Sequence, residues 1–421
     1  MRALTSLFPL LLAAGVLLAG NGLQGTLIVL RAEQEGFSSG LIGLMGTGYF
    51  AGFLISTLVS AKMVRAVGHI RAFAALAAIV AAGMLAFILW INPYWWVVLR
   101  FMMGFGFAGL FMVIESWLND ATDNSDRGRV LSIYRIIDLA FVTGGQLLLP
   151  LIGIEGFVLF VVTAMFLGLS LVPISLGDRT NPKPPAVAKF DLPMIWSISP
   201  IACLGCIIIG MTNSSFRLVG PLFASRVGLD TAEVAYFMSA GIIGGAVLQY
   251  PLGWMSDRFG RRKILVGTTM GAVVAGLYMS QFAGSDHIAL LAGSFAFGAF
   301  SMPLYSLSAA HANDRAGEGQ YVLLSSGLMF FFALGATIGP SISTWVMTLF
   351  GTSAFFTYIS AVHGSFVIAT LWRMSVSSSP GKAQRGKFTM LLRTSPALFK
   401  MARKVKNVSK SHSAKKPHSK A

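Results

Sequence analysis

Five charged side chains lie inside long apolar stretches of this 421-residue sequence. Charges in such surroundings are costly and usually serve a purpose. The five residues are Arg100, Glu115, Arg135, Asp138 and Arg217. A buried carboxylate becomes easier to protonate and can carry a proton, whereas a buried guanidinium can bind an anionic or polar group. The chemistry that these residue types indicate is therefore proton transfer and ligand binding.

Three of these residues are expected to form one ion network. Glu115 lies three residues before the end of its apolar stretch and Arg135 five residues after the start of the next one. Antiparallel neighbouring helices would bring the two side chains to one depth, so an ion pair is expected. Asp138 follows Arg135 by three residues and shares its helix face. The triad is either a structural lock between two helices or a site of proton coupling, since buried ion networks also occur without a function.

Uncharged polar residues extend the candidate site. Asn21 and Asn213 occupy matching positions near the middle of two apolar stretches. The alternative for any single amide is a hydrogen bond between helices, worth about 0.6 kcal/mol on average. The full set expected to line a substrate cavity is Asn21, Gln24, Arg100, Gln146, Asn213, Arg217 and Gln249.

The sequence does not indicate metal binding, nucleotide binding or hydrolysis. Cys203 and Cys206 form a CxxC with no histidine or further cysteine nearby, so they are interpreted as packing residues. His69, His311 and His363 are not spaced as metal ligands. The motifs GxxxxGK[ST] and HExxH do not occur. GxSxG has one match, GFSSG at 36–40, but it lies between two long apolar stretches and not after a predicted strand, so it does not indicate a hydrolase. Neither a metal, nor a cofactor, nor an enzymatic activity is expected.

The composition predicts an all-α integral membrane protein with twelve transmembrane helices. Hydrophobic residues make up 55% of the chain and charged residues 11%. A membrane-spanning helix needs about 20 apolar residues, whereas barrel strands would show shorter alternating segments. Twelve stretches qualify: 7–30, 39–61, 72–91, 95–118, 130–150, 155–176, 196–223, 233–255, 264–284, 287–309, 321–347 and 353–374.

The distribution of cations predicts the topology. Of the 32 Lys and Arg residues, most fall in the segments that are cytoplasmic if both termini are inside, and the outer loops hold only Arg31 and Arg226. Because positive loops stay in the cytoplasm, a multi-pass protein of the plasma (inner) membrane with both termini cytoplasmic is expected. The first apolar stretch continues to Leu30, so it is interpreted as a retained helix and not as a cleaved signal peptide.

A duplication organises the chain into two halves. The charged hinge GWMSDRFGRRK, residues 253–263, has a faded copy 192 residues upstream, AKMVRAVGHIR at 61–71. The same offset aligns Gly106 with Gly298 and Ser116 with Ser308 without a gap. The expected parts are two pseudo-symmetric six-helix halves, a cytoplasmic linker and a basic tail: 1–176, 196–374, 177–195 and 375–421. The tail is either an interfacial helix on anionic lipids or a disordered segment.

The hinge resembles a signature of the major facilitator superfamily, GxxxD[RK]xG[RK][RK]. Arg100 to Gly106, RFMMGFG, is similar to the second signature of that family, RxxxGxG. The stretch VIESWL at 113–118, with RGR at 127–129 and Gly145-Gln146, resembles the bacterial YcaD-like subgroup. The first hinge copy departs from the pattern, because Arg65 stands where Asp is expected.

The resemblance implies a cytoplasmic latch formed by Gly253, Asp257, Arg258, Gly260, Arg261, Arg65 and Glu318. Asp257 would lie against the start of the fifth span, near Arg127 and Val130, because a helix N-terminus favours an anion. Arg65 and Glu318 would form a sign-swapped second latch. For the cations Arg261 to Lys263, topology marking alone is the favoured interpretation.

The resemblance also implies the function. A secondary active transporter of a small molecule is expected, working by alternating access as a monomer, with coupling to protons left open and without nucleic acid as a partner. The alternatives are a membrane-embedded lipid-handling enzyme or assembly factor, and a channel. A histidine or carboxylate cluster at one membrane face would favour the enzyme, and rings of polar residues would favour the channel.

Overall fold

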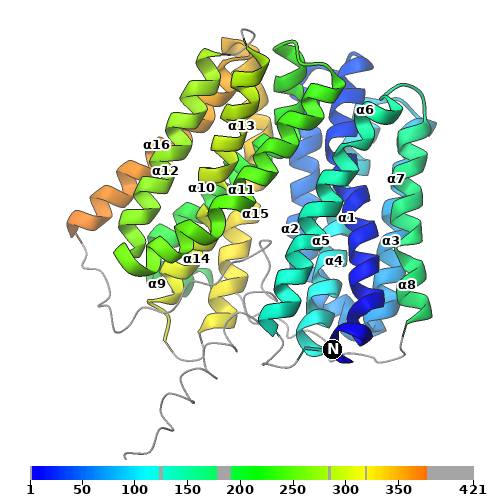
Figure 1. Ribbon diagram of the computed structural model, residues 1–421, viewed down its shortest axis with the longest axis horizontal. Helices are drawn as coiled ribbons and strands as arrows, with labels where there is room; N and C mark the ends of the chain where they lie inside the picture. The colour runs from blue at the N-terminus through cyan, green and yellow to red at the C-terminus, as the bar shows by residue number, and fades with distance from the viewer. Residues whose placement is uncertain (1, 123–126, 178–190, 283–285, 318–319, 377–421) are drawn as a thin grey trace, which may run out of the picture.

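The computed structural model describes residues 2–122, 127–177, 191–282, 286–317 and 320–376, and these are helical apart from short connections (Figure 1). The helices of the first half are α1 (Arg2–Gln34), α2 (Ser39–Val67), α3 (His69–Leu89), α4 (Pro93–Asp120), α5 (Arg127–Gln146), α6 (Leu148–Ile152), α7 (Val158–Leu169) and α8 (Leu171–Leu176). Those of the second half are α9 (Leu192–Ile198), α10 (Pro200–Arg226), α11 (Thr231–Phe259), α12 (Arg261–Gln281), α13 (His287–Ser301), α14 (Leu304–Asn313), α15 (Tyr321–Phe350) and α16 (Ala354–Val376). The basic tail lies outside the described residues.

Twelve spans are long and apolar enough to cross a membrane, as the sequence predicts. Three of them consist of two helices each: α5 with α6, α7 with α8, and α13 with α14. The span of α13 and α14 is divided at Met302 and Pro303, because proline lacks the N–H that would continue the helical hydrogen bonds. Pro340 does not interrupt α15, which runs through that residue. The short helix α9 covers the last residues of the expected linker.

Glycines let helices within each half approach to backbone contact. Gly52 of α2 and Gly244 of α11 lie at matching places of the repeat, and each faces the backbone carbonyl of a phenylalanine. Gly104 of α4 faces the carbonyl of Tyr49, and Gly298 of α13 faces that of Gly241. Any side chain at these positions would collide with main-chain atoms, so the pairs α2–α4 and α11–α13 are locked in the same way.

This packing corrects the alignment of the repeat. Gly104, not Gly106, is the structural equivalent of Gly298. The connection between α3 and α4 is two residues shorter than that between α12 and α13, and the gapless offset therefore fails beyond it. The equivalent of Ser116 moves from Ser308 to Ala310, and Asp120 becomes the equivalent of Asp314.

The two halves meet at the end of the bundle remote from the N-terminus. Figure 1 shows α1–α8 to the right and α9–α16 to the left, with α2 and α15 adjoining between them. Gly43 and Gly46, near the start of α2, lie against Pro340 of α15. Arg226 at the end of α10 forms an ion pair with Glu33 at the end of α1, 3.1 Å apart. These contacts close this end of the bundle.

A hydroxyl adds to the closure. Thr47 Oγ1 donates to the carbonyl of Thr337 across the two halves and lies 2.7 Å from Ser341 Oγ. We expect Thr47→Val to favour separation of the halves at this end, since it deletes the donor and keeps the shape, at a cost of about 1 kcal/mol. Accessibility of a cysteine at Ser341 to a thiol reagent should rise several-fold. Thr57→Val is the matched control, since that hydroxyl donates to Leu54 of its own helix, and equal accessibility in both variants would contradict the expectation.

Candidate substrate cavity and latch

Arg100 is a buried cation held by two neighbours in its own half. Its side chain on α4 is 1% exposed. Nη1 donates to Gln24 Oε1 of α1 at 2.6 Å, and the guanidinium carbon lies 4.5 Å from the ring centroid of Tyr49 on α2. Nη2 is buried and has no hydrogen-bond partner among the described residues. The structure thus places Gln24 beside Arg100 and leaves Nη2 of the guanidinium available as a donor.

Two further predicted residues present buried acceptors. Gln146, at the end of α5, donates from Nε2 to Thr26 Oγ1 at 2.9 Å. Gly145 and Gly22 allow α1 and α5 to pack backbone against backbone at this level. Within the described part of the chain, Gln146 Oε1 and Asn21 Oδ1 are buried without a hydrogen-bond partner. Unpartnered polar atoms in an apolar interior are unfavourable, so they mark a place where a ligand can bind.

The repeat mate of Asn21 has a different environment. Ser301 of α13 lies 3.2 Å from Asn213 Oδ1 and 3.3 Å from His363 Nε2. His363 Nδ1 donates to the carbonyl of Ile359 at 3.0 Å, so Nε2 accepts a hydrogen bond when the ring is neutral. Thr212 lies 3.4 Å from the same nitrogen. Asn213 is therefore linked to a fully buried histidine, and the two asparagines are not equivalent.

The remaining cavity residues divide between buried and exposed positions. Gln249 donates from Nε2 to Ser306 Oγ at 3.2 Å. Arg217 is exposed, although α10 is otherwise mostly buried. It comes near enough to Arg100 of the other half for the two guanidinium groups to interact electrostatically. The structure therefore brings the two predicted arginines toward each other across the two halves.

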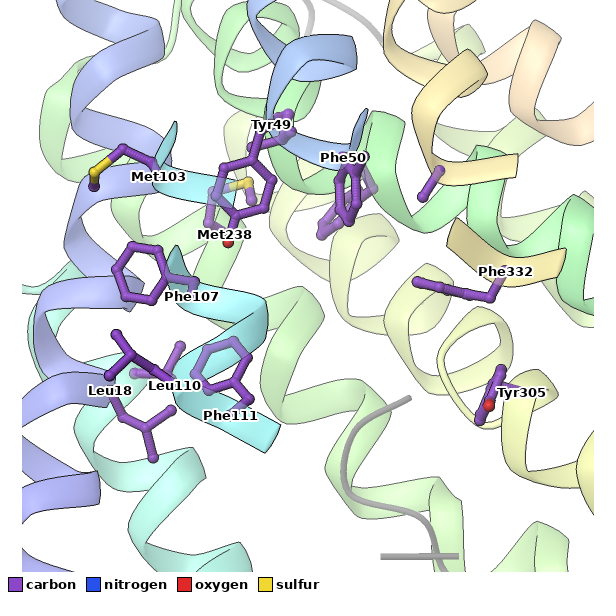
Figure 2. Close-up of a cluster of buried hydrophobic side chains, with 14 of the residues drawn as sticks. Leu18, Tyr49, Phe50, Met103, Phe107, Leu110, Phe111, Met238, Tyr305 and Phe332 are labelled. Carbon is purple, nitrogen blue, oxygen red and sulfur yellow. The ribbon is translucent and has the colours of Figure 1, made fainter. Parts of the chain in front are cut away.

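Aromatic side chains from both halves belong to one cluster of buried hydrophobic side chains (Figure 2). Figure 2 shows Phe107 and Phe111 of α4 on one side and Tyr305 and Phe332 of the second half on the other. The rings of Tyr305 and Phe332 meet edge to face, with centroids 5.6 Å apart. Large apolar surfaces with a few convergent polar groups are typical of small-molecule sites.

The predicted ion network is present in part. Arg135 Nη1 lies 3.9 Å from Asp138 Oδ2, and the two side chains are 18% and 14% exposed. Glu115 is 1% exposed, and its carboxylate interacts electrostatically with the hydroxyl group of Tyr305 in the other half. The expected ion pair between Glu115 and Arg135 stays a prediction.

The hinge of the second half is an ion-pair network. Arg261 lies 2.5 Å from Asp257 Oδ1 and 3.0 Å from Asp314 Oδ2, and it donates to Ser256 Oγ at 2.6 Å. The side chains of Arg261 and Asp314 are 5% and 3% exposed. The interpretation of Arg261 as a topology marker alone is therefore wrong, because a buried, paired guanidinium is part of the fold. Asp314 is not among the predicted site residues, although a carboxylate just beyond the tenth predicted span, which ends at residue 309, offered a signal.

Glycine makes the turn at the hinge possible. Gly260 joins α11 to α12 with a φ of 107°, a conformation that other residues rarely adopt. Gly253 is buried, whereas Arg258 is exposed and lies 5.5 Å from the ring centroid of Trp254. The contact expected between Asp257 and the start of α5 stays a prediction, since the side chain of Arg127 lies outside the described residues.

The hinge of the first half has the same shape with different chemistry. Gly68 repeats the positive φ of Gly260, at 85°. His69 takes the place of Arg261, is fully buried, and lies 3.1 Å from Ser116 Oγ through Nε2. Asp120, the equivalent of Asp314, is exposed and acts on His69 electrostatically. Arg65 is exposed, and its expected partner Glu318 lies outside the described residues.

The comparisons with known proteins agree with this architecture. The family model described as Major Facilitator Superfamily matches residues 10–248 and 202–410. This chain is a major facilitator superfamily transporter. Because the superfamily consists of transporters, the alternative of a lipid-handling enzyme is set aside, and a small molecule is the expected cargo of this superfamily member.

Relatives of this superfamily member cover nearly its whole length. It is 26% identical over 383 residues to the uncharacterized MFS-type transporter YcaD of Escherichia fergusonii, covering 90% of this chain and 97% of the relative. The YcaD protein of Escherichia coli strain UMN026 is 27% identical over 376 residues, covering 88% and 94%. The predicted resemblance to the YcaD-like subgroup is thereby confirmed.

Solved structures share the fold. The nucleoside transporter NupG matches with a TM-score of 0.74 at 12% identity, covering 87% of this chain and 98% of NupG. A bacterial homolog of the human lysosomal transporter Spinster, in an inward-facing and unoccupied conformation, matches with a TM-score of 0.67 at 13% identity, covering 96% and 97%. The prediction of two six-helix halves with the superfamily fold agrees with these structures.

Proposed function

We propose that this protein is a secondary active transporter of the bacterial inner membrane that moves a small polar molecule by alternating access. The observation that carries the proposal is the set of buried polar atoms of Asn21, Arg100 and Gln146 that have no hydrogen-bond partner among the described residues. Arg100 and Gln146 both hydrogen-bond to α1, the helix that carries Asn21. A substrate that bound there would satisfy these atoms and contact both halves. Rocking of the halves around that site would then carry it across the membrane.

The direction in which the cavity faces follows from the closed end. The contacts of Thr47 and of Arg226 with Glu33 close the end remote from the N-terminus. Most of the 32 cations fall on the opposite side of the predicted topology. Because cation-rich segments stay cytoplasmic, these contacts support a state in which the substrate site is open toward the cytoplasm.

A ligand screen tests the site. Purified full-length protein would be screened by thermal shift against metabolite and drug libraries, with Asn21→Ala as the site variant and Thr57→Val as a matched control. Compounds that stabilise the wild type and the control but not Asn21→Ala are expected, because deletion of the amide removes a ligand contact. Stabilisation of all three proteins by the same compounds would place the ligand elsewhere.

Coupling to protons is proposed for the network around Asp138. Its carboxylate is mostly buried and lies 3.9 Å from Arg135. We expect Asp138→Asn to retain binding of the compound found above and to lose acceleration of its uptake by a pH gradient in proteoliposomes, because an amide cannot release a proton. Glu155→Gln, which changes an exposed carboxylate, is the control. Unchanged dependence on the gradient in Asp138→Asn would assign the network a structural role.

A further inference from the structure

Arg100 presents a charge that the described protein does not neutralise. No carboxylate forms an ion pair with it in the described ranges of the chain. Its neighbours are the neutral amide of Gln24 and the ring of Tyr49. An ionised group out of water needs an opposite charge, because hydrogen bonds to neutral groups compensate only part of the lost hydration. Nη2 of Arg100, which has no hydrogen-bond partner among the described residues, is the atom at which a negatively charged group can bind.

A second cation approaches from the other half. Arg217 of α10 interacts electrostatically with Arg100, and the interaction between two like charges is repulsive. Both residues lie within the outer part of their spans, so they are at similar depth. An anion between them would be attracted by both and would also offset their repulsion.

The first half adds hydrogen-bond acceptors on α1, which contacts Arg100 through Gln24, and on α5, which packs against α1. Asn21 Oδ1 and Gln146 Oε1 are buried acceptors without a partner among the described residues. Gln146 and Asn21 belong to the helices α5 and α1, which pack backbone against backbone, and α1 also supplies Gln24 to Arg100. A ligand that satisfies the site therefore carries hydrogen-bond donors as well as negative charge.

We propose that the substrate is a small organic anion with at least one hydroxyl or amino group, and that its anionic group binds between Arg100 and Arg217. The anionic group is a carboxylate or a phosphate, since both match the geometry of guanidinium donors. The inference rests on the proposed function, because it assigns the cargo of the same cavity. An anion bound between the two arginines would contact both halves. Release of the anion would therefore accompany the separation of Arg100 from Arg217.

A fractionated extract tests the charge of the ligand. A protein-free bacterial small-molecule extract would be split on an anion-exchange column into a retained and an unretained fraction, and each would be added to the purified protein in a thermal-shift assay. The retained fraction is expected to raise the melting temperature of the wild type and to lose this effect on Arg100→Gln. Treatment of the retained fraction with a phosphatase separates the two chemistries, because loss of the effect assigns a phosphate and persistence a carboxylate.

The outcomes separate this inference from the proposed function. Stabilisation by the unretained fraction alone would overturn the anion and leave a transporter of neutral or cationic cargo. Stabilisation by neither fraction would count against the ligand cavity itself, and therefore against both proposals. Equal stabilisation of the wild type and Arg100→Gln by the retained fraction would place the anion away from Arg100.

The stability of the ligand-free protein gives an independent readout. If Arg100 is kept for a ligand, Arg100→Gln is expected to raise the melting temperature by a few degrees, because it removes a buried uncompensated charge. Arg71→Gln removes an exposed cation and is the control, expected to change nothing measurable. A lower melting temperature for Arg100→Gln together with retained anion binding would make Arg100 a structural residue and overturn the proposal.

Discussion

Replacement of Arg261 by alanine is expected to destabilise the protein by about 3–5 kcal/mol, which is the usual cost of removing one partner of a buried ion pair. Arg261 is 5% exposed and lies 3.0 Å from Asp314, which is 3% exposed. Without the guanidinium, that buried carboxylate loses this ion pair at the end of α14. The Ser256 hydroxyl on α11 loses its hydrogen bond from Arg261 as well.

The measurement is the melting temperature of the purified protein together with its yield as a monodisperse species. Lys263→Ala removes an exposed cation from the same turn and is expected to leave both unchanged. The double variant Arg261→Ala with Asp314→Asn should recover part of the loss, because the amide is neutral. A double variant that is less stable than Arg261→Ala alone would show that the loss does not come from the charge of the Asp314 carboxylate.

Gly298→Ala is expected to disrupt the second half. A methyl group on Gly298 would overlap the carbonyl of Gly241, which is main chain and cannot rotate away. The helices α11 and α13 would have to move apart to make room for the methyl group. We therefore expect the free energy of unfolding to fall by an amount at or above the upper end of the roughly 1–3 kcal/mol that overpacking usually costs. Since α11 and α13 form one of the largest contacts within this half, a strong loss of folded protein is expected.

Gly267→Ala is the matched control, because a methyl group there meets no atom within 4 Å. That change should be neutral or stabilising by up to about 1 kcal/mol through helix propensity. Folded yield and melting temperature are compared for the two variants. Similar values for both would show that α11 and α13 tolerate separation, and the close contact would then have little energetic weight.

The sequence predicts the spans well because a bilayer constrains composition strongly. Uniform apolar stretches predict the twelve spans, and the duplicated hinge predicts the two halves. The positive φ of Gly260 and Gly68 is known only from the structure. The alignment fails by two residues after α3, because loop length leaves no trace in a hydrophobic pattern. Gly104 could have been recognised as the equivalent of Gly298 only from the carbonyl that each one faces.

The candidate site was predictable where it uses rare residue types. Arg100 stands out in an apolar helix, and Gln24 follows Asn21 by one turn, so both could be assigned from the sequence. Thr26 and Ser301 could not, because a single hydroxyl in a membrane helix usually donates to its own backbone, as that of Thr57 does. Their roles depend on which neighbouring helix supplies the acceptor, and this is a property of packing.

The contact between α2 and α15 has a kinetic consequence. Gly43, Gly46 and Pro340 form smooth surfaces there, and the Thr47 hydroxyl supplies the hydrogen bond to α15. The close glycine contacts within each half keep that half rigid, so the halves move as units. Their separation then requires the exchange of a few hydrogen bonds between them, and not the withdrawal of interlocked side chains. The rate of switching between the two facing states should therefore depend weakly on temperature, compared with the steep dependence of unfolding.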